Sequence, residues 1–135
     1  MTQYNPARDI RETLINDGVT TPIYIGSEPM SPDVVITLYN YQGEAPSPKY
    51  LLDIPYLQVR SRANDYETAY NNILEVFNLI VGRSAFNINT TRYTGILANT
   101  NIFELGQDDN ERRILAANLR LFVEPTSTTQ HRKSL

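Results

Sequence analysis

The sequence predicts a single α+β domain in which two helices pack on one face of a mostly antiparallel β-sheet. Two amphipathic segments with helix start and stop signals are separated by segments in which apolar and polar residues alternate. The expected order is helix, three strands, helix, three strands, with tight connections, which is typical of an α+β sandwich. The 135 residues suit one domain, expected over residues 1–125, with a polar tail at 126–135 that is disordered when free.

The first helix is expected to begin at Asn5-Pro6. Asn is a favoured N-cap and Pro is favoured at the first helical position. Gly18 suits the left-handed residue that ends a helix. A short strand is then expected over 22–26, before a turn-rich connection. The apolar positions of this helix are Ala7, Ile10 and Leu14.

Two strands flank a proline-rich loop. The segment Asp33–Tyr41 is partly apolar on both faces, as expected of a central strand. The segment Tyr56–Arg62 alternates between an apolar face and a polar face that carries two arginines. Between them, residues 42–49 hold two prolines and a glycine, which predicts an exposed, mobile loop.

The second helix is the strongest local prediction. Asn64 is the expected N-cap, with Glu67 three residues later as in a capping box. Gly82 provides the stop signal. The apolar stripe comprises Tyr66, Ala69, Tyr70, Ile73, Leu74, Phe77, Ile80 and Val81.

Further strands are expected after this helix, over 86–89, 92–98 and 101–105. A polar turn at 106–111 leads to a strand over 112–124, whose residues alternate strictly between apolar and mixed positions. A helix over 111–121 competes with it, because Ala116-Ala117 favours helix. The period of two decides for a strand.

The composition offers little chemistry. The net charge of −3 gives no broad attraction to nucleic acid or anionic membrane, and there is no cysteine for a disulfide or thiolate site. Neither a signal peptide nor a membrane span is expected. His131, the only histidine, lies in the polar tail, where nothing would position a general base. No nucleophile elbow or phosphate-binding glycine loop occurs, so neither an enzyme nor a cofactor is predicted.

Two charged clusters have ordinary structural explanations. Asp108-Asp109-Asn110-Glu111 gathers oxygen ligands, but Arg112 occupies the third ligand position of a calcium loop, so an Asx-rich turn is favoured and no metal is expected. Arg60 and Arg62 could bind carboxylate or phosphate, or could lie on a solvent-facing strand edge. If that sheet face meets another subunit, the pair belongs to an interface. The short basic pairs elsewhere make no stripe for direct nucleic-acid readout.

The order of several segments resembles the phage tail terminator, or minor capsid (tail completion), family. The first long strand, Asp33–Tyr39, precedes a proline-rich loop. The strongest likeness is the arginine-bearing strand Val59–Ala63 running into the acidic and aromatic helix start Asp65–Ala69. The segments Leu105–Asn110 and Ala117–Leu121 are similar to the family's last hairpin.

The resemblance implies a structural protein of the virion, assembled in the bacterial host cytoplasm and located at the neck end of the tail. Such proteins form a homohexameric ring, in solution or only on the tube, that caps the head-proximal end of the tail tube. The ring stops polymerisation and presents a surface to the head connector, so the implied partners are further copies, the tube protein and the connector protein. Heterologous contacts are needed to close a ring. The residues expected at subunit or tube contacts are Arg60, Arg62, Tyr39, Tyr41, Glu44 and Lys49.

Two alternatives stay open on the sequence alone. One is another neck protein, either a head-closure or a tail-completion factor. The other is a monomeric cytosolic ligand-binding module, which would show an apolar pocket and no assembly. Under the ring hypothesis, double alanine substitution at Arg60 and Arg62 is expected to weaken assembly without unfolding the monomer, and the loop 42–49 and the tail 126–135 would act as contact arms.

Overall fold

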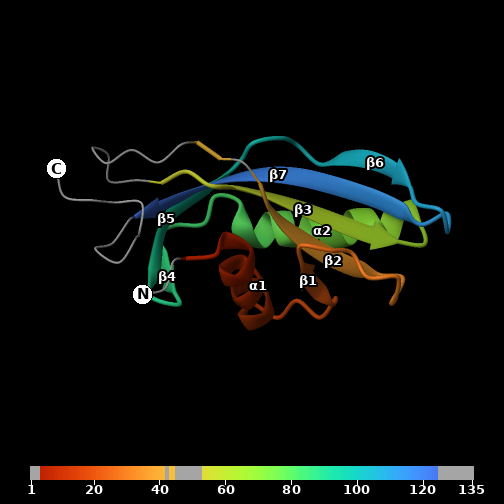
Figure 1. The fold of residues 1–135 in the computed structure, drawn as a ribbon, viewed down its shortest axis with the longest axis horizontal. Helices are drawn as coiled ribbons and strands as arrows, with labels where there is room; N and C mark the ends of the chain where they lie inside the picture. Colours follow the sequence, from red (N-terminus) through yellow and green to blue (C-terminus); the bar gives the residue numbers. More distant parts are fainter. Residues whose placement is uncertain (1–3, 42, 45–52, 125–135) are drawn as a thin grey trace.

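A seven-stranded sheet with two helices forms the described part of the chain (Figure 1). The computed structural model describes residues 4–41, 43–44 and 53–124. The strand order is β1-β2-β3-β7-β5-β4, and β6 pairs with β7 beside this path. The elements are α1 (Pro6–Asn16), β1 (Ile23–Ile25), β2 (Val35–Tyr41), β3 (Tyr56–Ala63), α2 (Tyr66–Ile80), β4 (Phe86–Ile88), β5 (Thr91–Ala98), β6 (Phe103–Gln107) and β7 (Arg113–Glu124).

Helix α1 begins as the sequence predicts. The Asn5 side chain accepts a hydrogen bond from the backbone N–H of Arg8, and Pro6 occupies the first helical position. The helix buries Ile10 and Leu14 completely. Asp17 is the C-cap, and Gly18 follows it with a φ of 97°.

The cap of helix α2 differs from the prediction. Asp65, and not Asn64, is the N-cap: its carboxylate accepts hydrogen bonds from the backbone N–H of Thr68 at 3.0 Å and from the Thr68 hydroxyl at 2.8 Å. Thr68 therefore takes the place expected of Glu67. The Asn64 amide instead donates to the Asp33 carboxylate at 3.4 Å. The residue predicted as the N-cap therefore makes a contact with a segment distant in sequence.

The buried face of α2 differs from the predicted stripe. Ala69, Ile73 and Ile80 are buried as predicted, and so is Val76, which the stripe left out. Other stripe residues are only partly buried against the core: Tyr70, Phe77 and Val81. Tyr66 is 49% exposed and stacks on Tyr70, with ring centroids 5.9 Å apart. The buried positions follow the spacing of a helix that lies flat on the sheet.

Strand β7 is the centre of the sheet. It pairs antiparallel with β3 along one side and with β5 and β6 along the other, which confirms the strand and removes the competing helix. Only β1, which pairs with β2, is parallel to its described neighbour.

Strand β6 lies two residues later than predicted, and pairing continues through Gly106 to Gln107. Gly106 has a φ of 115°, and the register shifts between Glu104 and Gly106. A glycine that tolerates this conformation lets the strand pass a bulge instead of ending in the expected turn.

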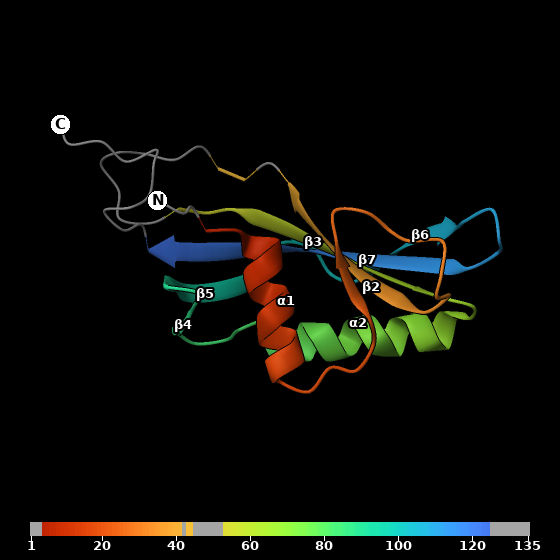
Figure 2. The same cartoon turned by 60° about the horizontal axis from the view of Figure 1, so that its bottom comes forward.

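Both helices cover one face of the sheet, as predicted (Figure 2). On that face, alternate residues of β3 and β7 are fully buried, among them Leu57, Val59, Leu119 and Leu121. The residues between them point to the opposite face, called the outer face below. The core thus lies on one side of the sheet, and neither helix covers the outer face.

Candidate functional site

The connection between β1 and β2 covers one end of the outer face. Arg62 fixes it there: its guanidinium donates to the backbone carbonyls of Pro32 at 2.7 Å and Asp33 at 3.2 Å. Arg62 is only 3% exposed. The expected solvent-facing position is therefore wrong for Arg62, because the connection folds over it.

Arg112 holds the same connection from β7's side. Its guanidinium donates to the carbonyl of Met30 at 2.6 Å and forms ion pairs with Asp33 at 3.2 Å and Asp108 at 2.8 Å. Hydrogen bonds from the Arg112 backbone and side chain and from the Asn110 backbone lower the pKa of Asp108, although burial acts to raise it. The Asp108 oxygens are occupied by this turn, as the sequence predicts, and within the described ranges no group of three His, Cys, Asp or Glu could hold a metal ion.

Arg60 lies at the boundary of the covered end. It forms an ion pair with Glu28 at 3.0 Å, donates to Gln58 at 2.9 Å, and lies 5.0 Å from the ring centroid of Tyr39. Burial raises the pKa of Tyr39, and the negative charge of Glu28 raises it further. Arg60 is therefore partly exposed but already paired within its own chain.

Beyond this connection, the outer face carries large side chains that are partly or fully exposed among the described residues. Strand register places Tyr41, Tyr56, Arg120 and Leu97 in one row across four strands, with Phe122 next along β7. The Tyr41 and Tyr56 rings lie 5.5 Å apart, and Leu97 is 46% exposed. These five residues, called the open patch below, combine large apolar surface with one cation.

Of the open patch, only Tyr41 was predicted from the sequence as a contact residue. The other four were not, and Arg120 is the charged one among them. Its guanidinium carbon lies 5.5 Å from the Phe122 ring centroid, and its Nε is buried without a hydrogen-bond partner. The available signal was its place in the alternation of β7, beside Asn118 and Phe122 on the face away from the core.

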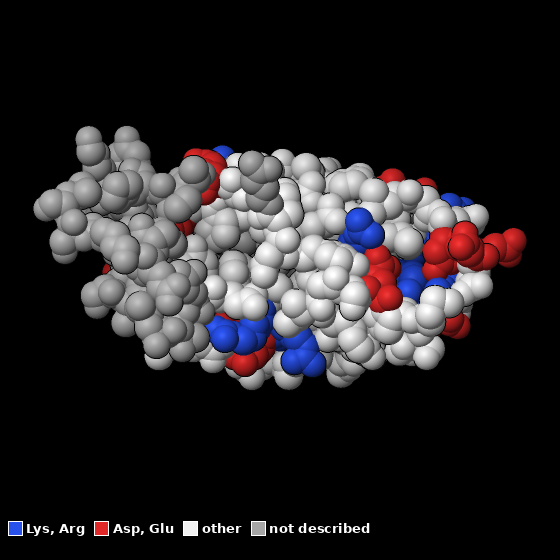
Figure 3. Space-filling view, in the orientation of Figure 1, with Lys and Arg blue, Asp and Glu red and all other residues white. Residues whose placement is uncertain are grey.

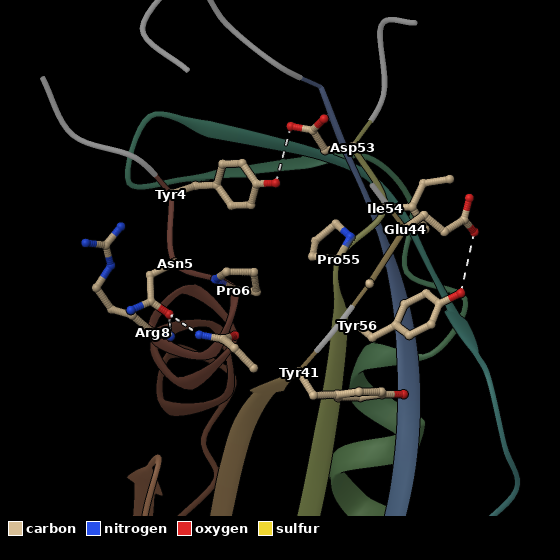
Figure 4. Close-up of a pocket in the computed structure, with 12 residues that line it drawn as sticks. Tyr4, Asn5, Pro6, Arg8, Tyr41, Glu44, Asp53, Ile54, Pro55 and Tyr56 are labelled. Atoms are coloured by element: carbon tan, nitrogen blue, oxygen red, sulfur yellow. Dashed lines mark hydrogen bonds between the residues drawn. The ribbon is translucent and has the colours of Figure 1, made fainter. Parts of the chain in front are cut away.

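A cleft of about 580 Å³ adjoins the open patch (Figure 4). Tyr41, Tyr56 and Glu44 belong to its lining, and the Tyr56 hydroxyl donates to the Glu44 carboxylate at 3.5 Å. Across the cleft, the Tyr4 hydroxyl donates to Asp53 at 3.3 Å. The structure thus brings predicted residues Tyr41 and Glu44 to one place, whereas Lys49 lies outside the described residues.

The charges gather in small groups over the surface (Figure 3). Exposed acids mark the end of the molecule that carries the β6–β7 turn, where Asp109 and Glu111 are located. In the part of the chain that is described, no helix is long and apolar enough to cross a membrane.

Comparisons with known proteins agree with this architecture. A family model described as "Bacteriophage tail terminator protein" matches residues 13–125. A chain in a structure titled "Virion of native gene transfer agent (GTA) particle" superposes with a TM-score of 0.71 at 16% identity, covering 88% of this chain and 94% of that chain. A second solved chain has a TM-score of 0.54 at 11% identity, covering 88% of this chain and 96% of its own. No curated protein sequence matches the chain.

Proposed function

Since the chain belongs to the bacteriophage tail terminator family, we propose that it caps the head-proximal end of the tail tube as a closed ring. The family is structural and not enzymatic, which assigns the chain a tail-related role in a phage virion and contacts with other phage structural proteins. The proposal adds that the ring is a homohexamer, stops tube polymerisation and presents a docking surface to the head connector.

The open patch is the observation that supports an assembly role best. It presents two tyrosines, a leucine and a phenylalanine around an arginine. Exposed apolar surface of this kind marks binding sites, and interfaces are enriched in aromatic residues and arginine. A sheet face that the described residues leave partly exposed is suited to contact a neighbouring protein.

The previously named residues divide into two groups under this proposal. Tyr39, Tyr41, Glu44 and Arg60 are partly or fully exposed and can contribute to subunit or tube contacts. Arg62 supports the connection over the outer face and acts on an interface only through that connection. A substitution that tests the interface should therefore change Arg60 and leave Arg62 in place.

The experiment that tests the proposal mixes the purified protein with purified tail tubes and images the tube ends by negative-stain electron microscopy. We expect a ring at one end of each tube. Bare tube ends would contradict the proposal, and binding to the isolated head connector instead would favour a head-closure or tail-completion factor. Size-exclusion chromatography with light scattering reports whether the ring also forms without the tube.

A further inference from the structure

Arg120 is the one arginine within residues 4–41, 43–44 and 53–124 whose guanidinium has neither a hydrogen-bond acceptor nor a carboxylate partner. Its Nε–H is buried, and its guanidinium carbon lies 5.5 Å from the centroid of the Phe122 ring. A buried N–H of a charged group costs free energy unless an acceptor is supplied. Arg120 as a whole is only partly buried, so a carboxylate from another molecule can pair with the accessible part of its guanidinium.

The surroundings of Arg120 favour a protein acceptor. Its cross-strand neighbours are Tyr56 and Leu97, and Phe122 follows on the same face of β7. An arginine ringed by aromatic and aliphatic side chains is typical of the anchor of a protein interface. Nucleic acid binding needs several cations along a backbone, and the open patch holds one.

The turn between β6 and β7, at the opposite end of the sheet from Arg120, carries exposed hydrogen-bond acceptors. Asp109 and Glu111, called the acidic turn below, are exposed and form no ion pair with any described residue. Asp108 differs, because Arg112 occupies its carboxylate. The acidic turn therefore has two carboxylates available to an outside cation.

A single copy cannot join these two features. Arg120 lies seven residues beyond Arg113 on an extended strand, which places it roughly 23 Å from the start of β7 at about 3.3 Å per residue. Figure 1 shows the β6–β7 turn at one end of the long axis, with β7 running away from it. Complementary groups at separated positions of one chain suit a head-to-tail contact between copies.

We propose that Arg120 in the open patch of one copy receives the acidic turn of the next copy. The contact is heterologous, so its repetition with a closing rotation yields a ring and leaves no copy with an unpaired Arg120. This inference rests on the proposed ring and specifies which two surfaces of the subunit form it. The charge pair aligns the subunits, while the tyrosines and Leu97 around Arg120 supply the apolar area.

A charge-swap experiment on the full chain tests the contact. The variants are R120E, D109K/E111K, and the triple variant R120E/D109K/E111K. Self-association is measured by analytical ultracentrifugation, and ring formation on tail tubes is measured by electron microscopy. We expect each single-surface variant to weaken association by at least about tenfold, since placing like charges in contact costs several kcal/mol. The triple variant should restore rings, because every contact then regains opposite charges.

Two controls separate the contact from changes in folding. The variant D109N/E111G removes both charges, and glycine relieves Glu111 of its left-handed φ of 62°. Lost association with an unchanged or higher melting temperature would then come from the charge alone. The variant E67K/E75K reverses exposed acids on α2 and should not rescue R120E.

Rings that form equally well with R120E, or that are rescued by E67K/E75K and not by the triple variant, would overturn this inference and leave the capping role intact. Wild-type protein that forms no assembly in solution or on tubes would overturn the capping role, and this contact with it. Loss of duplex DNA retention in R120E without loss of assembly would assign Arg120 to nucleic acid instead.

Discussion

At the scale of single residues, a buried carboxylate joins the first helix to the β4–β5 hairpin. Asp9 is fully buried in α1 and accepts hydrogen bonds from the Tyr93 hydroxyl and from the Asn89 amide, the latter at 2.9 Å. Burial raises the pKa of Tyr93, and the hydrogen bond to Asp9 and its charge raise it further, so the tyrosine stays protonated and remains a donor. The pair fixes α1 against the sheet.

Replacing Tyr93 with Phe should destabilise the fold. The change keeps the ring and removes one donor from a buried carboxylate, which costs about 1–3 kcal/mol. Urea denaturation monitored by circular dichroism measures this loss of stability as a lower midpoint concentration of urea, with an unchanged slope. Tyr41→Phe is the matched control, because Tyr41 is 37% exposed and surface changes stay within about 0.5 kcal/mol. Equal midpoints for both variants would show that Asp9 does not depend on Tyr93.

The two arginines of β3 should respond differently to alanine. Arg62→Ala leaves two carbonyls of the β1–β2 connection without their donor and should cost about 1.5–3 kcal/mol. Arg60→Ala removes a partly exposed ion pair, which is worth about 0–1 kcal/mol. Thermal melts of the two variants measure the difference. A more stable Arg62→Ala than Arg60→Ala protein would contradict the role given to the connection.

The difference between these arginines was beyond the sequence. The alternation of β3 places Arg60 and Arg62 correctly on the face away from the core. What buries one and leaves the other partly exposed is the path of a distant connection, whose turn-rich sequence specifies no direction. Arg120 lies on the same face by the same alternation, but only the positions of all other charges single it out as unpaired.

At the scale of elements, local signals predicted most boundaries. The N-cap of α1, the core strand β2 and the long strand β7 follow from capping and from the period of two. Two failures have a common form. The cap of α2 moved from Asn64 to Asp65, and β6 continued past Gly106, because tertiary pairing used a residue that the local pattern assigned otherwise.

The cap of α2 predicts a pH dependence. Hydrogen bonds from the Thr68 backbone and side chain lower the pKa of Asp65. The charged Asp65 carboxylate therefore stabilises the folded state fully above its unfolded pKa of about 3.9. This stabilisation is lost as the pH falls through the lower pKa that Asp65 has in the folded state. Asn caps helices nearly as well but does not titrate. The melting temperature of wild type should exceed that of Asp65→Asn by less and less as the pH falls from about 6 to about 2. This range brackets the pKa of an ordinary aspartate.

Thermal melts at several pH values measure this difference directly. An advantage that stays constant down to the lowest pH would show that the charge of Asp65 contributes nothing to the cap. Glu67→Gln serves as the control, since Glu67 is exposed in the first turn but is not the cap.

At the scale of the whole molecule, residues 4–41, 43–44 and 53–124 cover one face of the sheet completely and the other only in part. Helices α1 and α2 cover the first (Figure 2). The β1–β2 connection covers part of the second and leaves the open patch. The described residues thus combine a buried core on one face with exposed apolar surface on the other, as the proposed ring subunit would need.

The fold class was predictable because periodicity and order of elements determine which face each residue occupies. The family resemblance depended on the order of several weak segments and is confirmed by the match over residues 13–125. The proposed contact between copies rests on charges that are unpaired among the described residues, which only the structure identifies.

The most direct test of the capping role is the length distribution of tail tubes that polymerise in the presence of increasing amounts of this protein. Electron micrographs of the tubes give both their lengths and the state of their ends. The proposed role predicts shorter tubes as the protein is added, with a ring at one end of each tube whose growth has stopped. Tubes of unchanged length with bare ends would contradict it.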